Sequence, residues 1–260
     1  MNPSWTVWFA LTVAAPAALG QSFLGPTPYL CDHDSPWPVR SEGYYLETFE
    51  DGALNTPGVI GSGSVTGPGG ITDSVDCDDG VIDGLGRDGR SYFGPATAGI
   101  TFTFNAATFG GRLPQRTGIV WTDGVHILNA PDSIHFEAFD AAGQRLGTIS
   151  GSHPDGSVNS ETAEDRFYGV EHLPGVWRIR IWQTAGCCGI EVDHLQYGFI
   201  AECRADFNAD GFVDFFDFDA YVECFEGGEC PPGASADFDG DGFIDFFDFQ
   251  GFVDAFETGC

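Results

Sequence analysis

Two short acidic stretches in the C-terminal part of the chain carry side chains suited to holding a metal ion. The first runs DFNADGFVDFFD and the second DFDGDGFIDFFD. Oxygen-bearing side chains stand at positions one, three, five, nine and twelve of each: Asp206, Asn208, Asp210, Asp214 and Asp217, then Asp237, Asp239, Asp241, Asp245 and Asp248. Position six is Gly211 or Gly242. This is the ligand spacing of an EF-hand loop, in which the carbonyl of position seven, here Phe212 or Phe243, is a further ligand.

The chemistry that this spacing predicts is Ca²⁺ binding, with one ion in each loop. Carboxylates crowded into so short a loop repel one another, and a hard cation that takes several oxygens compensates them. Transition metals favour His or Cys donors, and Mg²⁺ requires a smaller octahedron. A solvated acidic turn is the alternative for a single stretch, but two copies with the same glycine and flanking phenylalanines favour a metal site. Position twelve is Asp rather than Glu, so the following helix must approach the ion closely.

Each loop leads into a predicted amphipathic helix. Apolar residues recur at helical spacing after both loops: Phe218, Tyr221, Val222 and Phe225, then Phe249, Phe252, Val253 and Phe256. Residues 227–236 are rich in Gly and Pro and are predicted to be a linker. Tandem loop-and-helix units with Asp at position twelve resemble the dockerin module over residues 203–260. The closing Gly259-Cys260 resembles the variant found in planctomycete secreted proteins.

The resemblance implies a calcium-folded attachment module whose partner is a cohesin-like or other cell-surface protein. Loop positions ten and eleven resemble the partner-recognition pair of dockerins. Here they are Phe215 and Phe216 in the first loop, and Phe246 and Phe247 in the second. A hydrophobic docking face is therefore expected. The alternative is that one ring of each pair lies in the core.

The charge of the whole chain excludes some classes of partner. Its 260 residues carry a net charge of −29, and all ten basic residues are Arg. Such a surface repels nucleic acids and anionic membranes, so neither is expected as a partner. A hydrophobic content of 42%, with 24 Phe, is enough for packed cores.

Residues 1–20 are predicted to be a secretory signal peptide. The run from Trp5 to Leu19 is apolar and uncharged, and Ala18-Leu19-Gly20 offers a cleavage site. A short membrane anchor is the alternative, but Pro16 interrupts the run and the run is short for spanning. We expect a secreted or cell-surface protein with no membrane span after cleavage.

Eight cysteines in an exported chain predict disulfides. Cys203 and Cys260 would clasp the two ends of the C-terminal module, and Cys224 and Cys230 would join the first helix to the linker. In the larger domain, we expect Cys31 and Cys77 each to pair with one of the adjacent Cys187 and Cys188. A zinc site is the competing interpretation, but paired C-x-x-C arms are missing.

Residues 21–200 are predicted to form an antiparallel β-sandwich of the jelly-roll type. Apolar and polar residues alternate at the strand period in the stretches 44–49, 100–104, 118–122, 134–136, 145–149, 166–170, 177–181 and 190–197. Gly, Asp, Asn and Pro clusters separate them. A closed barrel is the alternative. The fold class is thus mainly β, followed by a small helical calcium module.

Two acidic segments of this domain could do chemistry. Phe49-Glu50-Asp51-Gly52 near its start and Asp193 near its end are similar to the residues that meet around a structural calcium in jelly-roll carbohydrate-binding modules, which implies a possible second metal site at Glu50, Asp51 and Asp193. A solvated turn and a polar strand face are the alternative. The second segment, SVDCDDGVID between Ser74 and Asp83, follows Asp73 and could line another calcium loop, although a charged surface loop is favoured.

Residues 44–199 as a whole look like an uncharacterised β-sandwich family of exported bacterial proteins, on the segments SVDCDDGVIDG, GIVWTDG, AEDRFYGV and GIEVDHLQYG. No motif of a hydrolase elbow, zinc protease or P-loop occurs, and the six His are scattered. Glu137 could belong to a carboxylate pair but is expected to face solvent.

Three functions stay open from the sequence. The leading one is a secreted, non-enzymatic protein whose sandwich binds carbohydrate or another surface ligand while the calcium module attaches it. Trp121, Trp177 and Trp182 could stack on sugar rings, although core packing is expected for at least two of them. The alternatives are a small dockerin-bearing polysaccharide-degrading enzyme and a structural protein of the cell envelope.

Overall fold

The structure, a computed structural model, describes residues 21–41, 43–124, 133–153, 157–184, 189–200, 203–210 and 212–259. The chain divides into two compact units, Met1–Phe199 and Ile200–Cys260. The predicted signal peptide and the linker residues 201–202 lie outside the described residues. No helix in the described ranges is long and apolar enough to cross a membrane.

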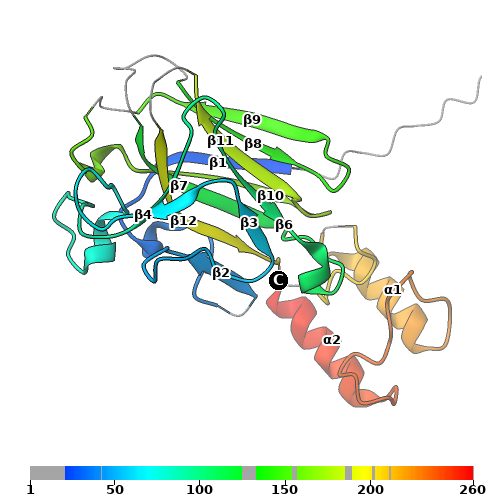
Figure 1. Cartoon of the computed structure of the whole chain (residues 1–260). Helices are drawn as coiled ribbons and strands as arrows, with labels where there is room; N and C mark the ends of the chain where they lie inside the picture. The colour runs from blue at the N-terminus through cyan, green and yellow to red at the C-terminus, as the bar shows by residue number, and fades with distance from the viewer. Residues whose placement is uncertain are drawn as a thin grey trace, which may run out of the picture. The chain divides into compact units, whose positions relative to one another are not determined.

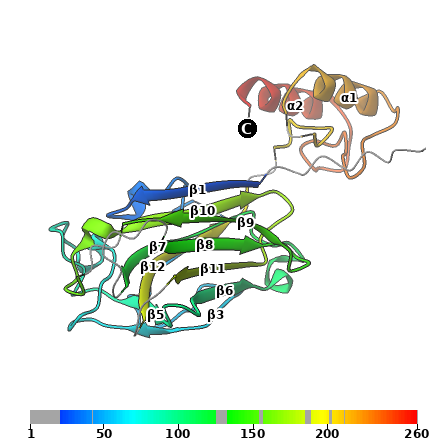
Figure 2. The same cartoon turned by 90° about the horizontal axis from the view of Figure 1, so that it is seen from above.

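The first unit is a sandwich of two antiparallel sheets (Figures 1 and 2). The seven-stranded sheet has the order β1 (Gln21–Pro28), β10 (Arg166–His172), β7 (Arg116–Gly124), β12 (Ile190–Gly198), β5 (Ser91–Gly94) and β4 (Ser64–Thr66), and β2 (Tyr44–Glu47) also pairs with β12. The five-stranded sheet has the order β3 (Val59–Gly61), β6 (Ile100–Phe104), β11 (Arg178–Gln183), β8 (Ile134–Phe139) and β9 (Arg145–Gly151). The predicted mainly-β sandwich is confirmed.

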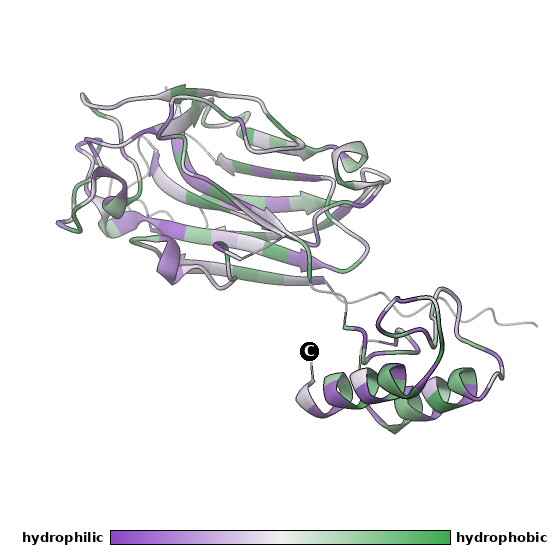
Figure 3. Ribbon diagram, turned by 90° about the horizontal axis from the view of Figure 1, so that it is seen from below, coloured by the Kyte–Doolittle hydropathy of each residue, from purple (hydrophilic) through white to green (hydrophobic). Residues whose placement is uncertain are grey.

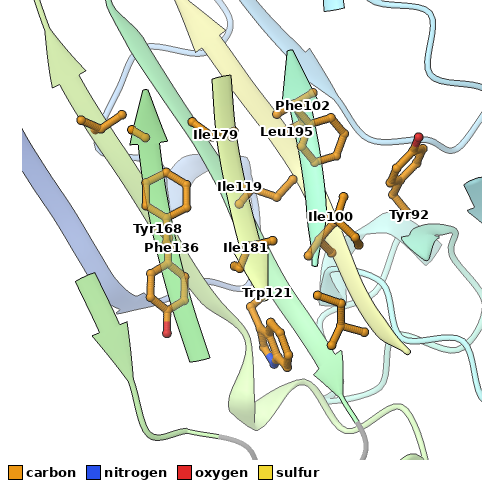
Figure 4. Packing of buried hydrophobic residues seen from close by; sticks show 14 of the residues in the cluster. Tyr92, Ile100, Phe102, Ile119, Trp121, Phe136, Tyr168, Ile179, Ile181 and Leu195 are labelled. Carbon is orange, nitrogen blue, oxygen red and sulfur yellow. The ribbon is translucent and has the colours of Figure 1, made fainter. Parts of the chain in front are cut away.

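Period-two alternation explains how the strands face the core. In β6 and β11 every second side chain is buried, and the residues between are only partly buried. Figure 4 shows the inward residues of both sheets, including Ile119, Phe136 and Ile181, packed between the layers. The strands that sequence alternation did not predict are β1 and the short β3, β4 and β5.

A second apolar cluster covers the outer face of the seven-stranded sheet. Tyr29, Trp37 and Val39 from the segment after β1 pack there with Val75, Val120 and Phe167. The disulfide Cys31–Cys77 ties this segment to the loop after β4. The expected pairing of Cys31 and Cys77 with Cys187 and Cys188 is therefore wrong, because packing across this face brings Cys31 and Cys77 themselves together. Cys187 and Cys188 lie outside the described residues.

The described part of the second unit has two helices, α1 (Phe215–Phe225) and α2 (Phe246–Thr258), and each begins at position ten of one acidic stretch (Figure 1). No helix forms between Gly227 and Ala236, as the Gly and Pro content predicts. Both helices alternate hydrophilic and hydrophobic residues along their length (Figure 3), and their apolar faces form one core with Phe207 and Phe238. The predicted Cys224–Cys230 disulfide is confirmed. Cys203 is disulfide-bonded, and Cys260 lies outside the described residues.

The described residues of the sandwich unit also form four short 3₁₀ helices. They are Asp32–Asp34, Asp76–Asp79, Ala106–Phe109 and Thr162–Glu164. Two of them, Asp76–Asp79 and Thr162–Glu164, lie in the segments that carry the buried acidic residues of this unit.

Candidate functional site

Some hydrogen bonds are equivalent in the two acidic loops of the second unit: the N–H of position five donates to the side chain of position three, from Asp210 to Asn208 and from Asp241 to Asp239. In the second loop, the Asp237 carboxylate accepts hydrogen bonds from the backbone N–H groups of Gly240 and Gly242. In the first, Asp206 accepts from the N–H of Asp210. Gly242 has a φ of +91°, a conformation that glycine adopts without strain. Gly211 lies outside the described residues. The turn expected at position six is thus present in the second loop.

The Asp residues at position twelve tie each helix back to its loop. Asp217 is buried in the first turn of α1, and its carboxylate accepts from the N–H groups of Asn208 and Asp214, at 3.0 and 2.9 Å. Asp248 in α2 accepts in the same way from Asp239 and Asp245, at 3.0 and 2.8 Å. These backbone donors hold the pKa of Asp248 below its usual value. The shorter Asp side chain therefore sits close against its loop, as expected from the sequence.

The donor set of the second loop fits a calcium ion. One carboxylate oxygen from each of Asp237, Asp239 and Asp248 lies within 4.8 Å of the others. Oxygens that bind one Ca²⁺ at 2.3–2.6 Å are separated by up to about 5 Å, so these three groups can share an ion. The ion would neutralise the carboxylates and fix the start of α2. The residues that would hold it are Asp237, Asp239, Asp241, Asp245 and Asp248 with the carbonyl of Phe243, and the equivalent residues of the first loop.

Large apolar side chains are exposed on both loops and at the start of both helices. Seven of them have half or more of their surface exposed: Phe212, Phe215, Phe216, Phe243, Ile244, Phe246 and Phe247. The exposed fraction of Phe216 is 67% and that of Phe247 is 68%. The alternative in which one ring of each pair lies in the core is wrong, since all four rings of positions ten and eleven are exposed.

In the sandwich unit, Asp51 and Asp193 of the predicted second metal site have different surroundings. Asp51 is exposed and accepts from Asn55 and from the N–H of Ala53. Asp193 is fully buried, and Asp78 and His194 offer ligand atoms within 4.8 Å of its carboxylate. Burial raises the pKa of Glu50, and the negative charge of Asp78 adds to the effect.

The acidic loop, defined here as residues 72–86, is packed onto the outer face of the seven-stranded sheet. Backbone N–H groups of the loop bind the sheet: that of Asp73 donates to Glu191 at 2.9 Å and that of Val75 donates to Asp193 at 3.0 Å. Asp73 and Asp76 are each 1% exposed. The interpretation of this segment as a charged surface loop is therefore wrong for these two residues, because their carboxylates turn inward.

Asp76 has a structural role within the acidic loop. Its carboxylate accepts hydrogen bonds from the N–H groups of Asp83 and Gly84 and from the Thr162 hydroxyl. With both oxygens occupied, Asp76 closes the loop on itself and needs no further partner. By contrast, Asp79 and Asp83 bind only local backbone N–H groups.

His194 stands at an irregular point of β12. Its φ of +43° is in the left-handed region, and the register between β12 and β7 shifts between Asp193 and Gln196. Nδ1 of the ring forms a hydrogen bond with the Tyr29 hydroxyl at 3.0 Å, and Nε2 forms one with the Asp78 carboxylate at 2.9 Å. The bulge thereby turns Asp193 and His194 toward the same carboxylate, that of Asp78.

Several candidate residues have other surroundings than expected. Glu137 is buried and pairs with Arg180 at 3.0 Å, so the expectation that it faces solvent is wrong. Among the three tryptophans, only Trp121 belongs to the core. Trp177 and Trp182 are half-buried, and the guanidinium groups of Arg178 and Arg180 lie over their rings. The prediction that at least two of the three tryptophans pack in the core is therefore wrong.

Three buried acidic residues were missed as site candidates. Asp123 is the second-last residue of β7, and Glu164 and Asp165 immediately precede β10. They belong to the segments WTDG and AEDRF, which overlap the end of the predicted strand 118–122 and the start of the predicted strand 166–170. The available signal was therefore their place at the ends of neighbouring predicted strands.

No family model matches the chain, and none of the curated proteins matches it either. Solved structures similar to it include a xylan-binding domain from CBM 22, with 12% identity over 61% of this chain and 96% of that one and a TM-score of 0.34. Another is the CBM22-1 xylan-binding domain of Paenibacillus barcinonensis Xyn10C, with 13% identity over 60% and 95% and a TM-score of 0.34. At such low identity the likeness concerns fold alone and says nothing of what this chain binds.

Proposed function

We propose that this chain is an exported calcium-binding protein that attaches to a protein partner through its C-terminal unit. The partner is a cohesin-like domain whose binding surface is apolar and bordered by basic residues. The observation that carries the proposal is the set of seven exposed apolar side chains, all of them within or directly after the two calcium loops. Apolar side chains gathered in this way are typical of protein interaction sites.

Charge supports the choice of a basic border on the partner. The exposed rings alternate with the acidic residues of both loops, and the chain as a whole carries a net charge of −29. Opposite charge on the partner would speed association and discriminate against wrong partners. An apolar centre with a charged border is also the usual composition of such an interface.

Calcium couples to docking through the geometry of the loops. Phe246 and Phe247 lie between Asp245 and Asp248, and both of these residues belong to the ligand set. An ion that fixes the two carboxylates also fixes the backbone that carries the rings. Calcium removal would therefore disorder the docking surface, because the loop carboxylates repel one another when no ion lies between them.

Two further observations support export. The disulfides Cys31–Cys77 and Cys224–Cys230 are typical of proteins that fold in an oxidising compartment. Residues 1–20 have the composition of a signal peptide.

The docking proposal is tested with a panel of immobilised cohesin domains and the purified full chain. We expect binding that EGTA abolishes. A variant with Phe215, Phe216, Phe246 and Phe247 all changed to Ser should lose at least tenfold in affinity while taking up the same amount of Ca²⁺. A control variant, Ile71→Ser with Ile82→Ser, removes exposed apolar residues from the sandwich and should bind normally. The proposal is overturned if binding is unaffected by both EGTA and the Phe substitutions, or if no cohesin domain binds the chain.

A second function is favoured for the sandwich by one polar and aromatic surface on the five-stranded sheet. Trp182 stacks on His135 at 4.8 Å, and His135 binds the hydroxyls of Ser150 and Thr184. Half-buried aromatic rings beside hydroxyl and guanidinium groups suit a carbohydrate ligand. We propose that this surface binds a polysaccharide such as xylan.

A glycan array with the full chain tests the second function. Trp182→Ala should abolish retention, whereas Phe93→Ala, which removes an exposed ring from the other sheet, should not. Hydrolysis of the glycans would instead favour a small dockerin-bearing enzyme. Partner binding without any glycan retention would favour a structural role in the cell envelope.

A further inference from the structure

We propose that the outer sheet face binds a polysaccharide that carries uronic acid side groups, and that Arg178 holds a carboxylate of this ligand. The outer sheet face is the side of the five-stranded sheet that is turned away from the core. It is defined by Arg178, Arg180 and Trp182 of β11, His135 and Glu137 of β8, and Arg145 of β9. The inference rests on the proposed carbohydrate-binding function of this face and adds the class of ligand.

Strand alternation places three of these side chains along β11. Ile179 and Ile181 belong to the core, and successive side chains of a strand point to opposite sides. Arg178, Arg180 and Trp182 therefore point away from the core. With a rise of about 3.3 Å per residue, Arg178 and Trp182 lie about 13 Å apart along the strand. The face is thus long enough for a few sugar units.

Strand pairing brings a third arginine to the same face. Phe139 of β8 pairs with Arg178 on one side and with Arg145 of β9 on the other. Because neighbouring strands lie about 4.8 Å apart, the Cα atoms of the two arginines are about 10 Å from each other. Glu137, which pairs with Arg180, is the one acidic residue at the strand positions of this face in the described part of the chain.

The sign of the charge on this face is opposite to that of the chain. The whole sequence has ten Arg and 39 acidic residues, with a net charge of −29. Three arginines and one glutamate leave two positive charges on the outer sheet face. A positive face on a strongly negative protein is complementary to an anionic group on a ligand.

Arg180 and Glu137 form the structural part of the face. Glu137 is 5% exposed, and its carboxylate lies 3.0 Å from Arg180 and 4.0 Å from Arg145. Nε and Nη2 of Arg180 donate to the carbonyls of Ala98 and Thr97, at 2.9 and 3.3 Å. Each nitrogen of this guanidinium thus has an acceptor within the protein.

Arg178 has the guanidinium that a ligand can use. Its Nε donates to the Thr103 hydroxyl at 3.1 Å, and the group lies 4.1 Å from the centre of the Trp177 ring. Within the described ranges, its two Nη groups have no acceptor and no carboxylate pairs with it. A carboxylate can accept two parallel hydrogen bonds from one guanidinium. Because Trp177 and Thr103 already hold the group in place, binding costs little side-chain freedom.

The charge of the rest of the chain limits how anionic the ligand can be. A densely charged polymer would be repelled by a protein with a net charge of −29. Isolated carboxylates avoid most of this repulsion, since charges beyond about 8 Å are largely screened at physiological salt. A neutral backbone across Trp182 and His135, with a uronic acid side group at Arg178, meets both conditions. Xylan substituted with glucuronic acid has this chemistry.

The test compares two polymers that differ only in the carboxylate. Calorimetry of the full chain in saturating Ca²⁺ measures binding to glucuronoxylan and to the same polymer after its uronic acids have been reduced to neutral sugars. We expect the native polymer to bind about tenfold more tightly, as for one charged hydrogen-bonded contact. Arg178→Gln should remove this difference and leave the affinity for the reduced polymer unchanged. The control Arg87→Gln makes the same charge change at an exposed residue of another segment and should keep the difference.

A second variant covers the case in which Arg178→Gln does not fold. Arg178→Lys keeps the charge but not the paired hydrogen bonds, so it should lose most of the tenfold difference. The inference is overturned, and the carbohydrate-binding function is kept, if the chain binds both polymers with equal affinity or if both variants retain the difference. Tighter binding of a sulfated xylan without uronic acids, lost in Arg178→Gln, would assign Arg178 to sulfate esters and also overturn it.

Trp182→Ala separates the inference from the function on which it rests. This variant should abolish binding to both polymers, whereas Arg178→Gln should affect the native polymer alone. A parent chain that binds neither polymer overturns the carbohydrate-binding function and the inference together.

Discussion

The rings of Tyr221 and Phe252 stack face to face, with centroids 3.9 Å apart and planes inclined by 4°. The two residues hold the same position in the two repeats, counted from Asp206 and from Asp237. Both are fully buried. The core of the C-terminal unit is thus built from equivalent residues of the two repeats, and neither helix can bury its apolar face without the other.

Truncation of one member of the stacked pair should unfold the unit more easily. We expect Phe252→Ala to lower its free energy of unfolding by about 3–5 kcal/mol, since a large buried ring is replaced by a cavity. Tyr221→Phe is the control. It keeps the ring and loses only a 3.3 Å hydrogen bond to the carbonyl of Ala236, so a change of about 1 kcal/mol is expected. Urea unfolding in saturating calcium, followed by near-ultraviolet circular dichroism, measures both.

Calcium should stabilise the same unit through position twelve. At a hundredfold excess over Kd, binding to the folded state alone adds about 2.7 kcal/mol to the free energy of unfolding. Asp248→Asn should weaken calcium binding and remove part of this gain. Asp254→Asn changes the same charge on the exposed side of α2 and should leave it intact. Equal calcium titrations of the two variants by calorimetry would contradict the assignment of Asp248 as a ligand.

Loss of the Cys31–Cys77 disulfide should destabilise the sandwich. The bond closes a loop with a sequence separation of 46 residues, for which the chain-entropy model gives about 4 kcal/mol. We expect Cys31→Ser with Cys77→Ser to show this loss in denaturant unfolding at constant calcium. A melting temperature unchanged from the parent would mean that packing of Tyr29 and Val75 alone anchors the acidic loop.

Acid should weaken the sandwich through His153. Burial lowers the pKa of His153 to about 3, and its ring binds the Tyr168 hydroxyl at 2.6 Å. The unfolded chain binds a proton near pH 6.5 and the folded chain does not, so stability is present above that pH and falls as the pH decreases toward 3. The expected loss by pH 5 is about 2 kcal/mol. His153→Gln should show a smaller loss over the same pH range in parallel thermal melts, and an identical loss would contradict this origin.

The features that sequence predicted well are those encoded over short stretches. The two loop-and-helix units follow from residue spacing within each acidic stretch, and β6 follows from the alternation Ile-Thr-Phe-Thr-Phe. Strands as short as β3 and β4 contain too few residues for a period to show. The exposure of Phe216 and Phe247 was left open because helical spacing alone does not say which rings a small core can accommodate.

The burial of acidic residues at the strand ends of the seven-stranded sheet was not predictable in the same way. Asp123, Asp165 and Glu191 come from three strand ends, and only the order of strands in the sheet makes them neighbours. The Cys31–Cys77 pairing has the same origin, because both residues meet only when the N-terminal segment and the acidic loop cover one face. A single sequence contains no record of such long-range proximity.

The hydrogen bond between the Asp73 amide and the Glu191 carboxylate joins residues that are 118 positions apart. During synthesis from the N-terminus, residues 72–86 therefore cannot form this hydrogen bond until β12 has been made. Contacts of such long range make folding slow. The sandwich is accordingly expected to reach its native packing only after β12 has been synthesised.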